Sequence, residues 1–151
     1  MITAEDSSVI ERPIEQVFAF LSEPANEPKW HTDVIEASLL APPMHANSEV
    51  RMKFKFMGVR EATMEVADYE PNQRIRLETK VGVMKGLKPT LTYLVEPASG
   101  GTRFTRRLEV KPEGLASLMT PMMKVMVKKN NAQFVMNLKK FLEISSSKTS
   151  G

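Results

Sequence analysis

The sequence predicts an α+β fold in which a curved antiparallel sheet of about seven strands wraps around one long C-terminal helix. Between residues 34 and 110, apolar and polar residues alternate in successive short segments, which is typical of strands with one buried and one solvated face. Between residues 112 and 144, apolar side chains recur at spacings of three and four, which is typical of an amphipathic helix. A sheet with one apolar face needs a cover, and this helix can provide it.

The N-terminal residues predict one strand followed by two short helices. Residues 2–11 are expected to form the strand, and Pro13 suits the first turn of the helix that follows. This helix places four apolar residues on one face, Ile14, Val17, Phe18 and Leu21. Residues 25–30 have room for one further helical turn. We expect Trp30, the only tryptophan, either to fill the core beside this turn or to stack on a ligand.

The alternating segments indicate which strand residues face the interior. Turn-forming residues separate the segments at Pro42-Pro43, Gly58, Pro71-Asn72 and residues 99–101. The positions expected on the apolar face are Ile35, Ala37, Leu39, Val50, Met52, Phe54, Phe56, Ala62, Met64, Val66, Ile75, Leu77, Thr79, Val81, Val83, Leu91, Tyr93, Val95, Phe104, Arg106, Leu108 and Val110.

The long helix is expected to begin at Thr120, because Pro121 suits a first helical turn, and residues 112–119 can form a short helix joined to it at a kink. Its predicted apolar face consists of Leu115, Met119, Met122, Met123, Met126, Phe134, Leu138 and Phe141. Four methionines lie between residues 119 and 126. Because methionine is unbranched and adaptable, this stretch is either ordinary core or one wall of an adaptable ligand cavity.

Polar residues on the same helix raise two further alternatives. Asn130, Gln133 and Asn137 either mark the edge of the apolar face or offer amides to a bound molecule. The lysines Lys124, Lys128, Lys129, Lys139 and Lys140 give the helix a basic outer side. That side is either simply solvated or makes weak peripheral contact with an anionic membrane.

Composition restricts the class of protein. Of 151 residues, 42% are hydrophobic and 26% charged, which is typical of a globular domain. The net charge of +3 is too diffuse to indicate a nucleic-acid partner. The absence of cysteine excludes disulfides and thiol chemistry and fits a cytoplasmic location. Residues 1–10 are not typical of a signal peptide. We expect one domain over residues 1–144 and a disordered, serine-rich tail over residues 145–151.

The sequence contains no motif of a known enzyme class that depends on a phosphate-binding loop, a nucleotide fingerprint or a nucleophile elbow. The two histidines, His31 and His45, are expected in surface loops. His31 together with Asp33 is the candidate pair for general acid/base catalysis, if the two side chains face the cavity. Histidines and carboxylates do not cluster, so we expect neither a metal nor another cofactor.

Four segments carry a resemblance to a known family. Residues 10–21, residues 24–30, the Gly-Gly-Thr hairpin of residues 100–106, and residues 112–115 with the long closing helix resemble the polyketide cyclase/dehydrase branch of the START-like (SRPBCC) superfamily. The resemblance covers roughly positions 2–144. It implies a helix-grip fold, as in START and birch-allergen-like proteins, with a deep cavity between the sheet and the C-terminal helix. It implies no shared catalytic motif.

Arg106 is the most unusual residue on the predicted apolar face. A lone buried guanidinium is very unfavourable, so it needs a partner or an opening to solvent. Either the strand register shifts near the hairpin and Arg106 is solvated, or Arg106 anchors a carboxylate, enolate or phenolate of a ligand. The hydroxyls of Thr79 and Tyr93 are expected to face the same interior, as satisfied wall groups or as groups that orient a ligand.

We therefore expect the protein to bind a small hydrophobic or aromatic molecule, lipid or polyketide-like, as a carrier that acts as a monomer or homodimer. The alternative is a cyclase/dehydratase-like enzyme that positions a polyketide-type substrate and stabilises an enolate, with Arg106 and Tyr93 as catalytic candidates. The expected ligand contacts are Trp30, Met52, Phe54, Phe56, Met64, Leu77, Thr79, Val81, Tyr93, Phe104, Arg106, Leu108, Met119, Met122, Met123, Met126 and Asn130.

Overall fold

The computed structural model describes the backbone of residues 1–149 and the side chains of residues 1–144. One antiparallel sheet contains seven strands in the order β1-β7-β6-β5-β4-β3-β2. The strands are β1 (Ile2–Ile10), β2 (Val34–Leu39), β3 (Glu49–Lys55), β4 (Val59–Glu70), β5 (Arg74–Val81), β6 (Thr90–Ala98) and β7 (Gly101–Val110). The predicted α+β helix-grip fold with seven strands is confirmed.

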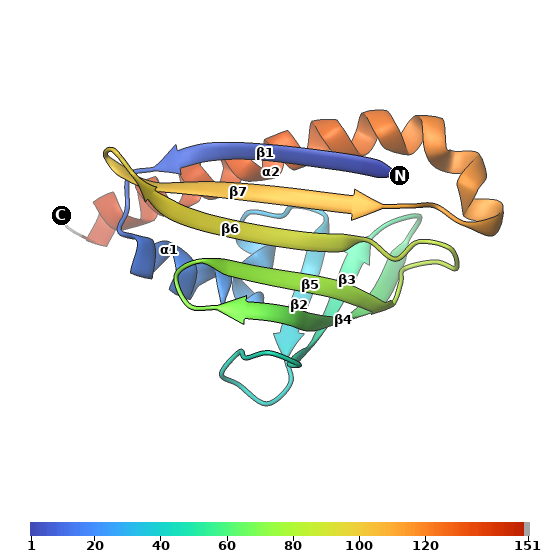
Figure 1. The fold of residues 1–151 in the computed structure, drawn as a ribbon, viewed down its shortest axis with the longest axis horizontal. Helices are drawn as coiled ribbons and strands as arrows, with labels where there is room; N and C mark the ends of the chain where they lie inside the picture. The colour runs from blue at the N-terminus through green and yellow to red at the C-terminus, as the bar shows by residue number, and fades with distance from the viewer. Residues whose placement is uncertain (150–151) are drawn as a thin grey trace.

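Four helical segments surround this sheet. They are α1 (Ile14–Leu21), the 3₁₀ segments η1 (Pro24–Lys29) and η2 (Gly114–Met119), and the long helix α2 (Thr120–Thr149). Figure 1 shows α2 running the length of the molecule beside β1 and β7, with its first turns next to η2 at one end. At the other end α2 reaches the β1–α1 junction, where Arg12 Nε donates a hydrogen bond to the carbonyl oxygen of Leu142 at 3.2 Å.

Most strand residues predicted to face the interior do so, but two do not. The pairing of β2 with β3 shifts between Val34 and Glu36, so the alternation changes phase and Ile35 is 40% exposed. The pairing of β4 with β5 shifts between Thr63 and Met64, where Val81 pairs with Thr63 and Thr79 with Met64. Lys80 is therefore the extra residue of a bulge, and Val81 points outward with 61% exposure.

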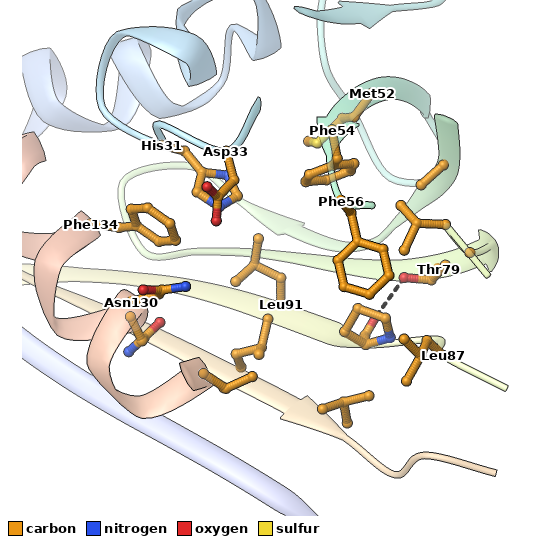
Figure 2. A pocket seen from close by; sticks show the side chains of 18 of the residues that line it. His31, Asp33, Met52, Phe54, Phe56, Thr79, Leu87, Leu91, Asn130 and Phe134 are labelled. Atoms are coloured by element: carbon orange, nitrogen blue, oxygen red, sulfur yellow. Dashed lines mark hydrogen bonds between the residues drawn. The ribbon is translucent and has the colours of Figure 1, made fainter. Parts of the chain in front are cut away.

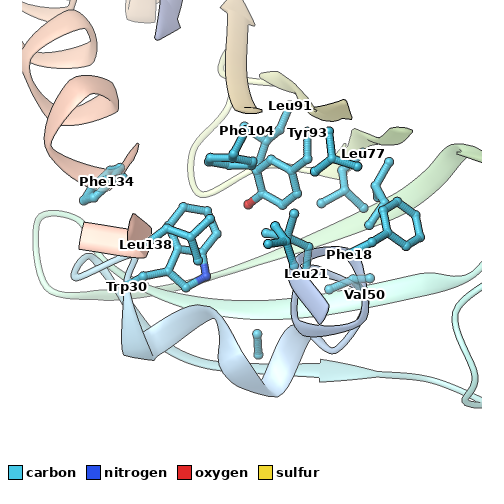
Figure 3. Packing of buried hydrophobic residues seen from close by; sticks show 14 of the residues in the cluster. Phe18, Leu21, Trp30, Val50, Leu77, Leu91, Tyr93, Phe104, Phe134 and Leu138 are labelled. Carbon is cyan, nitrogen blue, oxygen red and sulfur yellow. The ribbon is translucent and has the colours of Figure 1, made fainter. Parts of the chain in front are cut away.

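The main core lies between the sheet and the C-terminal half of α2. Figure 3 shows its centre, where Trp30, Tyr93 and Phe104 pack with their rings tilted or edge to face. The ring centroids of Trp30 and Tyr93 are 5.6 Å apart, and those of Tyr93 and Phe104 are 5.7 Å apart. Leu138 of α2 closes this cluster and is fully buried. Such aromatic contacts add packing energy beyond the area they bury.

The predicted kink between a short helix and the long helix is present at Met119–Thr120, but part of the predicted apolar face is wrong. Leu115 is 86% and Met122 55% exposed. Between residues 120 and 144, the buried residues of α2 are Met123, Asn131, Phe134, Val135, Leu138 and Leu142. One residue is about 100° of helical rotation, so Met122 lies well off the face that Met123 occupies.

The tail also differs from the prediction. The helix continues from Ile144 to Thr149, so the backbone of residues 145–149 is helical where disorder was expected. Residues 150–151, which complete the predicted tail, lie outside the described residues.

Candidate functional site

A cavity of about 200 Å³ lies between the concave face of the sheet and α2. Its walls come from β3 to β7, from the β5–β6 connection and from one side of α2. Figure 2 shows Phe56, Leu91 and Phe134 turned toward this space, with His31 and Asp33 at the end nearer Phe134. The lining is mainly apolar, and its polar groups are few, which is the usual composition of a site for a small organic ligand.

Ten of the predicted ligand contacts line this cavity. They are Met52, Phe54, Phe56, Met64, Thr79, Arg106, Leu108, Met123, Met126 and Asn130. The remaining lining residues were not predicted as contacts, namely Glu27, His31, Asp33, Lys55, Ala62, Gly82, Val83, Leu87, Pro89, Leu91, Val110, Val127, Asn131 and Phe134. Whether these side chains touch a ligand stays a prediction.

Seven predicted contacts do not line the cavity. Trp30, Tyr93, Phe104 and Leu77 belong to the packed core next to the inner end of the cavity. For Trp30 this corresponds to the core-filling alternative. Met119 packs against the smaller cluster around Leu87 and Met123. Val81 and Met122 are exposed, because of the bulge in β5 and the rotation of α2 described above.

The inner end of the cavity holds a buried polar cluster of Glu27, His31, Tyr93, Arg106 and Asn131, which we call the polar cluster. All five residues are buried. Tyr93 Oη donates a hydrogen bond to the Glu27 carboxylate, at 3.0 Å from Oε1 and 3.1 Å from Oε2. His31 Nδ1 lies 3.8 Å from Glu27 Oε2, too far for a hydrogen bond.

Arg106 is 3% exposed, so the solvated alternative is wrong and the strand alternation is correct. Its Nη1 donates a hydrogen bond to Asn131 Oδ1, and Asn131 Nδ2 donates in turn to Asp6 Oδ2 at 2.7 Å. The guanidinium also lies 5.2 Å from the centre of the Phe134 ring, within range of a cation–π interaction. Within the described part of the chain, Arg106 Nε and His31 Nδ1 are buried without a hydrogen-bond partner.

Burial and the neighbouring charge change the acidity of this cluster. Burial raises the pKa of Glu27 to about 7, although Arg106 and the hydrogen bond from Tyr93 act in the opposite direction. Burial and then the positive charge of Arg106 hold the pKa of His31 well below its usual value, so His31 is neutral. Burial, followed by the nearby Glu27 carboxylate, raises the pKa of Tyr93 well above its usual value. Glu27 is therefore the group that changes charge near neutral pH.

Sequence reasoning missed Glu27 and misplaced His31. His31 was expected on the surface but is 7% exposed and lines the cavity, where its ring centroid lies 4.1 Å from that of Phe134. Its nearest carboxylate is that of Glu27 in place of the predicted Asp33. One signal was available: in a 3₁₀ helix residues three apart share a face, which aligns Pro24, Glu27 and Trp30.

The other polar residues singled out by the sequence are largely satisfied within the protein. Thr79 Oγ1 donates to the carbonyl oxygen of Pro89 at 2.6 Å, as a satisfied wall hydroxyl would. Asn137 Nδ2 donates to the carbonyl oxygen of Trp30 at 3.1 Å, and Gln133 donates to Asn137. Asn137 therefore joins α2 to the segment after η1, Gln133 supports Asn137 from within the same helix, and Asn130 lines the cavity.

The sequence pattern of the family described as polyketide cyclase / dehydrase and lipid transport matches residues 1–143. The chain belongs to this family. The match confirms the resemblance drawn from the four segments above. No curated protein matches the chain.

Several solved structures share the fold at low sequence identity. The di-domain ARO/CYC BexL of the BE-7585A biosynthetic pathway is 18% identical with a TM-score of 0.77, over 97% of this chain and 48% of that chain. A protein from Thermus thermophilus is 15% identical with a TM-score of 0.74, over 95% of this chain and 99% of that one. DynU16 of the dynemicin biosynthetic locus is 16% identical with a TM-score of 0.69, over 95% of this chain and 48% of that chain.

The described residues contain no candidate for a membrane span or a metal site. None of their helices is long and apolar enough to cross a membrane. In the same described residues, no group of three or more histidine, aspartate or glutamate side chains is arranged to hold a metal ion.

Proposed function

We propose that the protein binds a small hydrophobic or aromatic molecule in the cavity between the sheet and α2, and acts as a carrier. The observation that supports this most is the combination of an apolar wall with two unpartnered buried nitrogens, Arg106 Nε and His31 Nδ1, at its inner end. An unsatisfied buried donor is unfavourable by about 1–3 kcal/mol, so such groups call for a partner that the protein itself does not supply. An oxygen of a bound ligand is such a partner.

The outer part of the cavity is suited to molecules of varied shape. Met52 and Met64 line it from the sheet, and Met123 and Met126 line it from α2. Methionine side chains adopt many rotamers and fill irregular space, so walls of this kind adjust to different apolar bodies. A carrier of lipid-like or polyketide-like molecules needs this tolerance.

A cyclase/dehydratase-like enzyme is the second candidate, and the polar cluster favours it. The raised pKa of Glu27, about 7, lets this carboxyl group give or take a proton near neutral pH. Arg106 can stabilise an enolate oxygen in a water-poor site. BexL carries the description ARO/CYC, and it shares this fold. Glu27 is the candidate general base. Tyr93, predicted to help stabilise an enolate, donates its hydroxyl to Glu27, and burial raises its pKa.

Native mass spectrometry of the gently purified protein tests the binding function. We expect a bound apolar molecule of one chemical class, which extraction then identifies. The variant Ala62→Leu fills space in the cavity wall, so it should lose that molecule. Ala37→Leu is the matched control, because Ala37 is equally buried but does not line the cavity. Equal occupancy of both variants would contradict binding in this cavity.

The fate of the bound molecule separates the two candidates. A carrier returns it unchanged after incubation, and Glu27→Gln has no effect on its recovery. An enzyme converts an added polyketide-type substrate, and Glu27→Gln reduces that rate by roughly 10²–10⁴-fold, the range expected for loss of a general base.

A further inference from the structure

Within the polar cluster, no anion is hydrogen-bonded directly to the guanidinium of Arg106. Arg106 is buried and permanently charged, yet its side-chain hydrogen bond goes to the neutral amide of Asn131. The nearest carboxylate within the cluster, Glu27, is engaged by Tyr93 and makes no hydrogen bond to Arg106 among the described residues. A buried guanidinium is usually paired directly with an anion.

We propose that the polar cluster is a subsite for an acid, in which a carboxylate or acidic phenolate of the ligand accepts hydrogen bonds from Arg106 Nε and His31 Nδ1 while Glu27 takes up one proton. This inference rests on the proposed binding function and adds the ligand's charge. Arg106 and His31 both line the cavity and are more than nine-tenths buried, and each has a nitrogen without a hydrogen-bond partner among the described residues. The apolar remainder of the ligand extends toward Phe56 and Met126.

Proton uptake follows from the groups that face Glu27. Tyr93 faces it from β6, Arg106 from β7 and His31 from the segment after η1, and burial keeps His31 neutral. From α2 the cluster receives Asn131 and Phe134, which do not titrate; Asn131 connects Arg106 to Asp6 of β1. Asp33 and Lys55 complete the charged lining.

Arg106 is therefore the one fixed positive charge inside this cluster. A second anion beside Arg106 makes an ionised Glu27 less favourable, because two carboxylates then share one buried positive charge. The lowest-energy bound state has an ionised ligand and a protonated Glu27. Binding of an acid should weaken as pH rises above about 7, by up to tenfold per pH unit for one proton.

Matched probe pairs test this inference by isothermal titration calorimetry. Naphthoic acid and naphthamide share an aromatic body, and decanoic acid and decanol share an aliphatic one. We expect each acid to bind at least about tenfold more tightly than its neutral partner at pH 7, as expected for charge-assisted hydrogen bonds. Titrations at pH 8, where Glu27 of the free protein is mainly ionised, in buffers of different ionisation enthalpy should show close to one proton taken up with the acids and none with the neutral probes.

Two substitutions assign the effect to residues. Glu27→Gln keeps a hydrogen-bond acceptor for Tyr93, and it should abolish proton uptake while acids still bind. Arg106→Gln should remove the preference for acids while naphthamide still binds, and Arg106→Lys should restore part of the preference if Arg106→Gln folds poorly. Equal affinity within each pair overturns the acid subsite and leaves the proposed function intact. Failure of all four probes to bind overturns both.

A different observation concerns the outer end of the molecule. Seven large apolar side chains are exposed on η2, the first turns of α2, the β3–β4 hairpin and the end of β5: Met57 (68%), Val59 (68%), Val81 (61%), Leu115 (86%), Leu118 (79%), Met122 (55%) and Val125 (71%). Figure 1 places these segments at the same end of the molecule, and the cluster of Phe56, Met84, Met119 and Val127 connects them. We call this surface the apolar rim.

Lysines accompany the apolar rim. Lys55, Lys85, Lys88, Lys111, Lys124, Lys128 and Lys129 are exposed, and none forms an ion pair with a residue that the structure describes. Exposed apolar side chains beside unpaired lysines suit the surface of an anionic membrane, where the apolar groups enter the headgroup region and the lysines contact phosphates.

We infer that the apolar rim docks on an anionic membrane surface, next to the cavity walls formed by Phe56, Met123 and Met126. The sequence predicted membrane contact along the whole basic side of the helix. The proposed contact surface is limited to the N-terminal half of α2. Lys139 is excluded, because its Nζ contacts Glu143 and the carbonyl oxygen of Val9, both at 2.7 Å.

Vesicle co-sedimentation at low salt tests the membrane proposal. Vesicles of phosphatidylcholine and phosphatidylglycerol should retain the protein, and vesicles of phosphatidylcholine alone should not. The double variant Leu118→Ser/Val125→Ser should reduce retention about tenfold. Met136→Ser is the matched control, since Met136 is exposed on the other half of α2, and it should not change retention. Equal retention by both vesicles, or dimerisation of the wild type that the double variant abolishes, would overturn the proposal.

Discussion

The two halves of α2 cover the same sheet in different ways. The C-terminal half buries Phe134, Val135, Leu138 and Leu142 and is held at its end by Arg12 and Lys139. In the N-terminal half, residues 120–130, only Met123 is buried, and Met126, Val127 and Asn130 face the cavity instead of a packed core. One half therefore contributes most of the stability, and the other leaves space for a ligand.

This difference predicts the largest effect for substitutions in the C-terminal half. Leu138→Ala should lower the free energy of unfolding by about 3 kcal/mol, because it removes a fully buried side chain from a packed core. Met126→Ala should lower it by about 1 kcal/mol or less, since Met126 already borders a cavity. Urea unfolding of both variants measures the contrast, and equal losses would show that the halves are packed alike.

A pH series separates the polar cluster from the rest of the core. Burial raises the pKa of Glu27 from 4.5 to about 7, so the folded state binds the proton more tightly than the unfolded state. This contribution to stability is complete below pH 4.5 and is lost as pH rises through about 7, with a magnitude on the order of 3 kcal/mol.

Glu27→Gln isolates this contribution. The lowered pKa of His31 acts in the opposite sense, since stability falls as pH drops below the usual histidine pKa of 6.5, and that effect is common to wild type and variant. The unfolding free energy of the wild type should therefore fall relative to that of Glu27→Gln as pH rises from 5 to 8. This range covers most of the interval between the usual pKa of Glu27 and its raised pKa, and extends just beyond it. A difference that does not vary with pH would contradict the raised pKa.

Tyr93→Phe should have a smaller effect. It removes the hydroxyl that donates to Glu27, which lowers the unfolding free energy by about 1 kcal/mol at pH 8, where Glu27 is mainly ionised. At pH 5 the loss should be smaller, because a protonated Glu27 depends less on a donor. Thermal or chemical unfolding at the two pH values measures this, and a loss that is larger at pH 5 would argue against the assigned hydrogen bond.

The smallest effect is expected in the N-terminal half. Leu118→Ser changes a side chain that is 79% exposed, so the unfolding free energy should stay within about 0.5 kcal/mol of the wild-type value. Urea unfolding measures it. A loss above 1 kcal/mol would mean that Leu118 packs against protein in solution, for instance against a second copy of the chain.

Much of the fold was predictable from the sequence because strand alternation and helical spacing persist over long segments. Arg106 was placed correctly on the buried face by alternation alone. Ile35 and Val81 were placed wrongly, because single bulges invert the alternation and leave no clear mark in the sequence. Met122 was placed wrongly because successive apolar residues leave the phase of a helix undetermined to within one position.

The polar cluster was only half predictable. Arg106 and Tyr93 are conspicuous in apolar strands, whereas Glu27 lies in a short polar segment where a glutamate is normally solvated. Its burial depends on η1 packing against the sheet, which is a tertiary effect. The size of the cavity likewise depends on how far α2 lies from the sheet, which no local pattern specifies.

Nuclear magnetic resonance of methionine methyl groups tests the central claim most directly, because the chain contains 11 methionines distributed over the cavity, the core and the surface. With naphthoic acid added to protein labelled at these methyls, we predict that the largest shifts fall on Met52, Met64, Met123 and Met126, which line the cavity. Met44 in the core and Met57 and Met136 on the surface should remain unchanged. Shifts confined to Met57, Met122 or Met136, or no shifts at all, would contradict binding between the sheet and α2.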